Sequence, residues 1–305
     1  MNVIGRFAPS PSGRMHLGNI FTALLAWLSV RAQGGEMVLR IEDLDPERCK
    51  REYADQLKDD LRWLGLDWDR EQPAQSTRTE AYAEIFAQLR ANNQVYPCYC
   101  SRADLHAAAA PHAADGRILY AGTCRDLTDD QRAAQTKQPA WRLRVPDADY
   151  GFTDGLQGYC SENLPRHCGD FILRRADGVY AYQLAVVADD LAGNVTEVVR
   201  GMDLLESTPR QLYLYALLCV KPPRFYHTPL LLAPDGRRLS KRERDLDMGA
   251  LRQRLRPAEL TGFLASLAGF VPEGFAATPA ELLCHFSWDR IRREAISVPE
   301  LPRKP

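Results

Sequence analysis

Apolar and polar positions along the chain predict a mixed α/β fold. An apolar run at residues 3–7 has strand character, and a helical pattern follows it over residues 16–33. A second apolar run at residues 37–41 predicts another strand, and apolar residues at helical spacing predict helices over residues 51–66 and 79–91. This succession of strands and helices is typical of an open parallel sheet covered by helices.

The same sheet is expected to resume in the second half of the chain. It should restart at residues 170–174 and, after a turn at Gly178, continue through residues 180–190. Residues 195–200 are rich in β-branched side chains and predict a strand that ends at Arg200.

The C-terminal part is expected to be mainly helical. A helix should begin at Ser207, with a serine or threonine cap and a proline in its first turn, and run to about residue 219. Residues 260–267 and 280–285 predict two more helices before a proline-rich tail.

The bulk composition is that of an ordinary soluble protein. The 305 residues are 45% hydrophobic, which suffices for a main domain with an appendage. No signal peptide follows Met1, and no apolar run reaches the roughly 18 residues of a membrane helix. We therefore expect a cytoplasmic protein with no membrane partner. The net charge of −1 means that any RNA contact must come from local basic patches.

Residues 6–20 carry the strongest chemical signal in the chain. Pro9, Pro11 and Gly13 mark a tight loop between the first strand and a helix that begins at His16. Such a junction presents unpaired N–H groups and the positive end of the helix dipole, which suit the phosphates of a nucleotide. On spacing alone, an ordinary strand-to-helix turn explains the segment about as well.

Two charged residues stand where predicted strands end. In an open parallel sheet, ligands bind beyond the carboxyl ends of the strands, which is where Glu42 and Arg200 would lie. A carboxylate at Glu42 can hold an ammonium group or a ribose hydroxyl, although a solvated loop acid is the simpler alternative. Arg200 supplies a fixed cation at the end of another strand.

Residues 96–165 have a different character and are expected to form an insertion. They include an alanine-rich stretch at residues 107–114. Cys98 and Cys100 precede that stretch and Cys124 follows it, so that three thiolates can supply three corners of a tetrahedral zinc site. The alternative is three reduced cysteines without a metal, because Cys-x-Cys is a weaker signal than Cys-x-x-Cys.

Residue chemistry alone leaves the fourth zinc ligand open. His106, His112 and Tyr120 all lie between the cysteines. Histidine is favoured over tyrosine, because imidazole binds zinc far more commonly than phenolate does.

Several of these motifs resemble one enzyme family. Residues 16–19 (HLGN) resemble the HIGH signature of class I aminoacyl-tRNA synthetases, and residues 238–242 (RLSKR) resemble their KMSKS loop. Residues 6–10 and 39–43 resemble the glutamyl-tRNA synthetase lineage. The two signatures occur in the family's order, at opposite ends of one predicted fold.

Two residues depart from the signatures. Asn19 stands where the first signature has its second histidine, and it can still donate a hydrogen bond. Leu239 replaces methionine in the second signature, which is a conservative apolar change. The resemblance covers nearly the whole chain and is weakest after about residue 256, where glutamyl-tRNA synthetases add an anticodon-binding domain for which this chain has no room.

The resemblance implies an α/β class I synthetase fold with a Rossmann-like parallel sheet. Residues 1–95 and 166–236 would form the catalytic domain that binds nucleotide and amino acid, and residues 96–165 a zinc-binding insertion that faces tRNA. Residues 237–305 would supply the KMSKS-like loop and a short helical C-terminal region, without an anticodon-binding domain.

The resemblance also implies roles for individual residues. His16 and Lys241 would be catalytic, with the Lys241 ammonium neutralising charge on the departing pyrophosphate. ATP, bound with Mg²⁺, would contact His16, Gly18, Asn19, Ser240 and Lys241. L-Glutamate would be held by Arg6, Ala8, Ser10, Glu42, Tyr182 and Arg200.

The cysteine pattern resembles the zinc-binding insertion of the glutamyl-queuosine tRNA(Asp) synthetases, in which a tyrosine is the fourth ligand. This resemblance implies one structural Zn²⁺ on Cys98, Cys100, Tyr120 and Cys124, with His112 as the next choice. The expected activity is ATP-dependent activation of L-glutamate and its transfer to queuosine in tRNA(Asp). The alternatives are a minimal synthetase that charges a tRNA 3' end and a catalytically silent RNA-binding paralogue.

Overall fold

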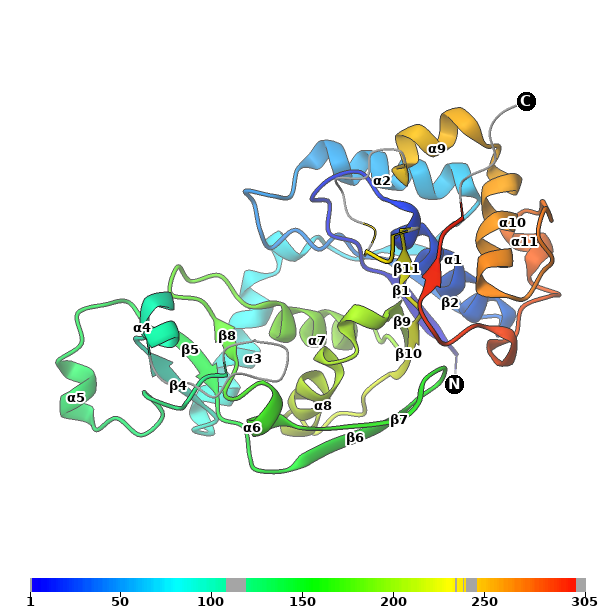
Figure 1. The fold of residues 1–305 in the computed structure, drawn as a ribbon. Helices are drawn as coiled ribbons and strands as arrows, with labels where there is room; N and C mark the ends of the chain where they lie inside the picture. Colours follow the sequence, from blue (N-terminus) through cyan, green and yellow to red (C-terminus); the bar gives the residue numbers. More distant parts are fainter. Residues whose placement is uncertain (1, 108–118, 234, 238, 240–245, 300–305) are drawn as a thin grey trace.

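A computed structural model describes residues 2–107, 119–233, 235–237, 239 and 246–299 (Figure 1). Its centre is built from parallel strands. One parallel sheet has the order β1 (Ile4–Phe7), β2 (Glu36–Leu39), β3 (Arg70–Glu71). The strands β9 (Glu197–Gly201) and β10 (Arg224–Thr228) also pair in parallel.

These two groups of strands lie next to each other. The backbone N–H of Thr196, just ahead of β9, donates to the carbonyl of Ile4 at 2.9 Å. The sheet expected from the apolar pattern is therefore confirmed for β1, β2 and β9, and the carboxyl ends of these strands point the same way.

The helix α1 (Leu17–Ala32) packs closely on this sheet and follows the predicted helix. His16 and Gln33 are its caps. A side chain on Gly5 of β1 would meet Val30 Cγ2 at 2.3 Å, so the glycine permits the close approach of strand and helix. Leu24, Leu25 and Leu28 of α1 are fully buried, so α1 is central to the main core.

The next two helices also confirm the pattern. Helix α2 (Arg51–Leu64) ends at Gly65, whose φ of 76° is the left-handed conformation that favours glycine. A short turn η1 (Gln75–Thr77) then leads into α3 (Thr79–Ala91), whose bounds are those predicted.

Residues 170–190 do not continue the parallel sheet, which corrects the prediction. The strand β8 (Ile172–Arg174) pairs in an antiparallel sheet with β5 (Ala140–Leu143), and β5 pairs with β4 (Val95–Cys98). Residues 182–192 form the helix α7 (Tyr182–Ala192) and not a strand. Every residue from 184 to 190 is buried, so α7 has no polar face that would reveal a helical period.

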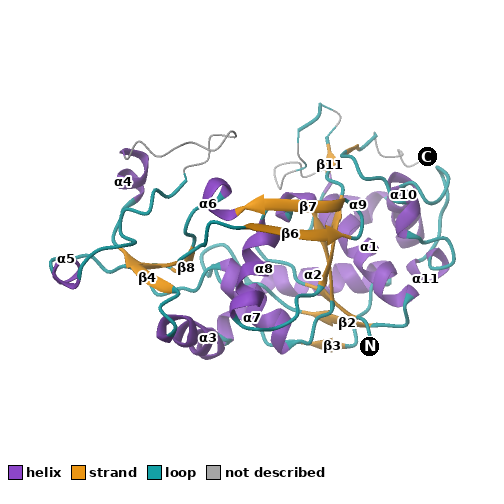
Figure 2. Ribbon diagram, turned by 90° about the horizontal axis from the view of Figure 1, so that it is seen from below, coloured by secondary structure: helices purple, strands orange, loops and turns teal. Residues whose placement is uncertain are grey.

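A long hairpin between β5 and β8 extends from the antiparallel sheet to the parallel strands. Its strands are β6 (Asp149–Asp154) and β7 (Gly158–Asn163). Figure 1 shows the hairpin running toward β10, and Figure 2 shows its two strands side by side. The backbone N–H of Gly155 at the hairpin turn donates to the carbonyl of Phe225 at 2.8 Å. The division of the chain into domains, and a zinc-binding role for the insertion, stay predictions.

The helix after β9 was predicted correctly except for its cap. The helix α8 (Ser207–Leu217) is confirmed, but its predicted cap is wrong: Glu206 is the N-cap and makes no side-chain capping bond. The hydroxyl of Thr208 instead accepts from Arg200.

The other elements are α4 (Arg102–Ala107), α5 (Asp129–Ala133), α6 (Leu164–His167), η2 (Met202–Leu204), β11 (Leu231–Leu232), α9 (Met248–Arg254), α10 (Pro257–Ala268), α11 (Pro279–Leu282), η4 (Trp288–Arg290) and β12 (Ile296–Ser297). Within the described ranges, no helix combines the length and the apolar character that crossing a membrane requires.

Candidate active site

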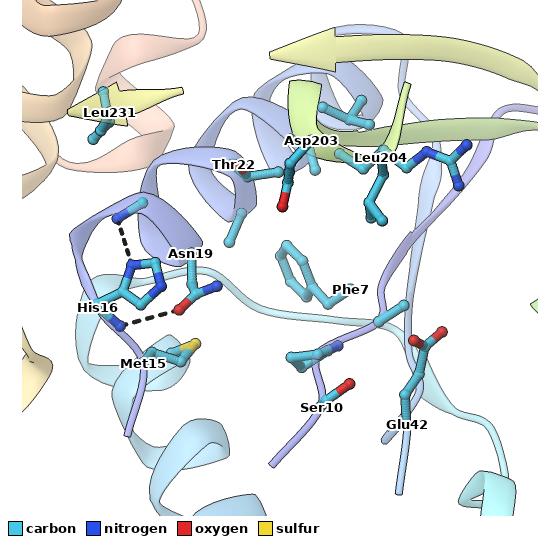
Figure 3. Close-up of a pocket in the computed structure, with 18 of the residues that line it drawn as sticks. Phe7, Ser10, Met15, His16, Asn19, Thr22, Glu42, Asp203, Leu204 and Leu231 are labelled. Carbon is cyan, nitrogen blue, oxygen red and sulfur yellow. Dashed lines mark hydrogen bonds between the residues drawn. The ribbon is translucent and has the colours of Figure 1, made fainter. Parts of the chain in front are cut away.

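A pocket of about 480 Å³ opens at the carboxyl ends of β1 and β9, beside the start of α1. Figure 3 shows His16 and Asn19 on one side of it and Glu42 on the other. The predicted ATP and glutamate residues that the structure describes all line this pocket: Arg6, Ala8, Ser10, His16, Gly18, Asn19, Glu42, Tyr182 and Arg200. Ser240 and Lys241 lie outside the described residues. The pocket thus gathers residues from both halves of the chain, and their binding roles stay predictions.

The N-terminus of α1 forms one wall of the pocket. His16 Nδ1 accepts from the backbone N–H of Gly18 at 3.1 Å, and Asn19 Oδ1 accepts from the backbone N–H of His16 at 3.1 Å (Figure 3). This reciprocal pair is a capping box, which fixes both side chains at the positive end of the helix dipole. Asn19, a departure from the family signature, therefore closes the helix cap in this chain.

Glu42 stands on a network of buried charges. Its carboxylate accepts from Arg40 Nη2 at 3.0 Å, and Arg40 Nη1 donates to Asp190 Oδ1 at 2.7 Å. Arg40 has no exposed surface, so this bridge holds Glu42 in place. Burial raises the pKa of the Glu42 carboxyl, and the nearby guanidinium groups of Arg40 and Arg6 offset this only in part. A buried carboxylate of this kind suits an ammonium ligand.

Arg6 joins the ends of the two central strands. Its Nη1 donates to the carbonyl of Val199 at 3.0 Å, and its Nε lies 3.7 Å from Asp190 Oδ1. Asp190 also forms an ion pair with Arg40, so its single negative charge is shared by two guanidinium groups. Positive charge at Arg6 is thus left partly uncompensated beside the pocket.

Arg200 is held by neutral acceptors. Its three bonded nitrogens donate to His227 Nε2 at 3.0 Å, Gln211 Oε1 at 2.9 Å and Thr208 Oγ1 at 2.7 Å. Among the described residues, no carboxylate lies within ion-pair distance of Arg200, although its side chain is buried. Burial lowers the pKa of this guanidinium. A buried cation without a carboxylate partner suits an anionic ligand.

The three predicted zinc cysteines come together in the antiparallel part of the molecule. The Sγ atoms of Cys98, Cys100 and Cys124 all lie within 4.8 Å of one another. The Sγ atoms of Cys100 and Cys124 are 3.6 Å apart, and the Tyr120 hydroxyl lies 3.4 Å from Cys98 Sγ. Among His106, His112 and Tyr120, the Tyr120 side chain alone belongs to the described residues.

This cluster fits a four-coordinate zinc ion. Bonds of about 2.3 Å to sulfur and about 2.0 Å to oxygen place tetrahedral ligands roughly 3.5 to 3.8 Å apart. The Cys100–Cys124 and Cys98–Tyr120 distances are close to this range, and the three Sγ atoms lie within 4.8 Å of one another. Burial and the neighbouring Cys98 raise the pKa of Cys100 to about 12, and burial also raises the pKa of Tyr120. Zinc binding would therefore have to displace the protons of Cys100 and Tyr120. Zinc binding itself stays a prediction.

Known proteins identify the family of this chain. It matches the family described as tRNA synthetases class I (E and Q), catalytic domain, over residues 2–276. The chain belongs to this family. It is 49% identical over 291 residues to the glutamyl-Q tRNA(Asp) synthetase of Nitratidesulfovibrio vulgaris, with 91% of this chain and 90% of the relative covered. It is 47% identical over 311 residues to the same-named protein of Symbiobacterium thermophilum, with 97% and 95% covered.

Solved structures agree on the fold. A glutamate tRNA ligase from Elizabethkingia meningosepticum, determined with its amino acid, has a TM-score of 0.84 and 24% identity, and the match covers 97% of this chain and 67% of that one. This likeness concerns the fold. The family match and the named relatives together establish this class I synthetase as a ligase-type enzyme.

Asp203 is a pocket residue of this class I synthetase that sequence reasoning overlooked. It lies in η2, directly after β9, and its exposed side chain lines the pocket (Figure 3). Since β9 ends at Gly201, the same rule that identified Glu42 beyond β2 would have indicated Asp203.

Proposed function

We propose that this class I synthetase activates L-glutamate with ATP and Mg²⁺ and transfers it to the queuosine base of tRNA(Asp). One observation carries the proposal: Arg6, Glu42 and Arg200 line a single pocket next to the capped N-terminus of α1. Glutamate has two carboxylates and one ammonium group, which match two cations and one anion. Relatives that are 47% and 49% identical and bear the name glutamyl-Q tRNA(Asp) synthetase support the choice of acceptor.

Different pocket residues would bind glutamate and ATP. Arg6 and Arg200 would bind the two carboxylates of glutamate and Glu42 its ammonium group, with Ala8, Ser10 and Tyr182 completing the wall. His16, Gly18 and Asn19, at the start of α1, would hold the phosphates of ATP. Mg²⁺ would neutralise phosphate charge.

The reaction would be an in-line displacement at phosphorus. The glutamate α-carboxylate oxygen would bond to the α-phosphorus, the bond from that phosphorus to the bridging oxygen would break, and pyrophosphate would leave. We propose that Ser240 and Lys241 act on the departing pyrophosphate, with Lys241 neutralising its developing charge.

We further propose that Cys98, Cys100, Tyr120 and Cys124 hold one structural Zn²⁺. Four protein ligands would leave no open position for a substrate, so the ion would order the insertion and take no part in activation. The distances within the cluster support this assignment.

Two assays test the proposed function. Glutamate-dependent exchange between ATP and labelled pyrophosphate is expected for the enzyme and would be absent in a silent RNA-binding paralogue. Transfer of glutamate to tRNA(Asp) lacking its 3'-terminal adenosine separates the acceptors. Transfer should persist if queuosine accepts glutamate, and its loss would show instead that the enzyme charges the 3' end.

A further inference from the structure

A row of three buried side chains lies behind the pocket and ends at Arg200. Asp154 Oδ2 lies 2.6 Å from His227 Nδ1, and His227 Nε2 lies 3.0 Å from Arg200 Nε. The exposed fractions of the three residues are 2%, 0% and 4%. Asp154 belongs to the β6–β7 hairpin, His227 to β10 and Arg200 to β9, so the row connects three elements.

The hydrogen bonds define the tautomer of His227. The Nε of an arginine always carries a hydrogen, so His227 Nε2 must accept from Arg200 with its lone pair. The ring proton then lies on Nδ1 and is donated to the Asp154 carboxylate. Burial lowers the pKa of His227 despite its bond to Asp154, which is consistent with a neutral ring.

Asp154 is itself held in one orientation. Its Oδ1 accepts three backbone N–H groups, from Leu156 at 3.0 Å, Gln157 at 2.9 Å and His227 at 3.2 Å. Its Oδ2 therefore faces His227. The hairpin turn sits tightly on β10, because a side chain on Gly155 would meet the ring of Tyr226 at 2.0 Å.

We propose that Asp154 and His227 are positioning residues that orient the Arg200 guanidinium for a carboxylate of the substrate. The inference rests on the proposed function of the pocket and adds two residues that lie outside it. Of the five N–H groups of Arg200, three have acceptors in His227, Gln211 and Thr208. One N–H on each terminal nitrogen is left for a bound carboxylate. The direction in which these two N–H groups point depends on the acceptor at Nε, because that acceptor fixes the orientation of the guanidinium plane.

Asp154→Asn tests the proposal with a nearly isosteric change. The three backbone N–H groups should keep the amide oxygen at the Oδ1 position, so the amide NH₂ faces His227 Nδ1. His227 would then carry its proton on Nε2, which lies 3.0 Å from Arg200 Nε and 3.2 Å from Thr208 Oγ1, so the ring could no longer accept from Arg200 Nε. Exposed Asp149 starts the same hairpin, and Asp149→Asn serves as the matched control.

The expected results are specific. In the exchange assay, Asp154→Asn should raise the KM for glutamate roughly tenfold or more and leave the KM for ATP within about twofold. The Asp149→Asn variant should match the parent. Nitrogen-15 NMR of the His227 ring should show the Nδ1-H tautomer in the parent and the Nε2-H tautomer in Asp154→Asn.

Two further variants keep the test decisive if Asp154→Asn does not fold. His227→Gln retains an acceptor within reach of Arg200 Nε, whereas His227→Leu removes it. The KM for glutamate should rise much more in His227→Leu than in His227→Gln, and equal values would overturn the proposal. A parent ring in the Nε2-H tautomer would overturn it, as would a switched tautomer with an unchanged KM.

Failure of the proposed function would give a different result. A parent without glutamate-dependent exchange would refute glutamate activation. The NMR arm would then still decide the positioning role, because the Arg200 Nε–H resonance must shift in Asp154→Asn if that residue orients the guanidinium through His227. An unshifted resonance would contradict the inference.

Discussion

Glu42 is a carboxylate that water hardly reaches, and its protonation should control the binding of glutamate. An exposed glutamate titrates at about pH 4.3, and burial raises the pKa of Glu42 above its usual value. Below that raised pKa the carboxyl is neutral and loses its attraction for an ammonium group. The KM for glutamate in the exchange assay should therefore rise as the pH falls, beginning above the range of an ordinary glutamate.

Glu42→Gln separates this titration from that of the substrate. The amide keeps an oxygen for Arg40 but does not titrate. Its KM for glutamate should be about tenfold higher than that of the parent near pH 7. The rise in KM that the titration of Glu42 causes at low pH should disappear. Exposed Glu80, in the first turn of α3, offers Glu80→Gln as a control that should behave as the parent. A Glu42→Gln variant with the parent's pH profile would remove Glu42 from ammonium binding.

Single residues at the ends of strands were predictable from the sequence. Glu42 follows β2 and Arg200 lies near the end of β9, two strands whose apolar and β-branched content is evident, and the structure brings both residues to one pocket. Asp154 could not be found in this way, because 73 residues separate it from His227 and its strand has alternating exposure around a glycine. Its role depends on tertiary contacts that no local pattern encodes.

At the scale of elements, we expect the cap of α1 to affect both stability and nucleotide binding. Asn19→Ala removes one half of the capping box and should lower the free energy of unfolding by about 1 kcal/mol, measured by urea denaturation. Asn19→Asp keeps the acceptor and should retain the stability. It should nevertheless raise the KM for ATP, because it adds a negative charge beside the phosphates. Equal stability of Asn19→Ala and the parent would show that this half of the capping box contributes nothing.

Helices with one apolar face were predicted well, and uniformly buried ones were not. Helix α3 begins and ends at the predicted residues because its exposed positions alternate with Tyr82, Phe86 and Leu89 at helical spacing. Helix α7 was mistaken for a continuation of the sheet, because an apolar run that is buried on all sides carries no helical period. Periodicity thus locates surface helices better than central ones.

The cysteine cluster lies within residues 96–165, the predicted insertion, and we expect its removal to affect that part of the enzyme. Cys124→Ser should lose about one zinc per chain by elemental analysis, because it removes one of four ligands. Transfer to tRNA should then fall more than glutamate-dependent exchange, since the candidate active-site pocket is built from other elements. Exposed Cys284 supplies the control Cys284→Ser, which should keep the metal and both activities.

Two outcomes would correct this account of the cluster. Freshly purified parent protein without zinc would remove the metal site. A parallel loss of exchange and transfer in Cys124→Ser would leave the site in place but contradict its separation from activation.

At the scale of the whole molecule, the two ends of the fold differ in their secondary structure. Figure 1 shows the antiparallel sheet and α5 at one end of the molecule and the helices α9, α10 and α11 at the other. The segment after the KMSKS-like loop reaches back to the first motif, because the backbone N–H of Met248 donates to the carbonyl of Met15 at 2.9 Å. The start of α9, which follows the second motif in the sequence, is therefore bonded to the backbone just ahead of α1.

The central claim is that glutamate is activated here and then attached to queuosine, and a single charging assay tests it most directly. Labelled glutamate and ATP would be incubated with the enzyme and either queuosine-containing or queuosine-free tRNA(Asp). We predict that label enters the queuosine-containing tRNA and that the queuosine-free tRNA stays unlabelled. Equal labelling of both tRNAs would contradict the account, because the acceptor would then lie elsewhere on the tRNA.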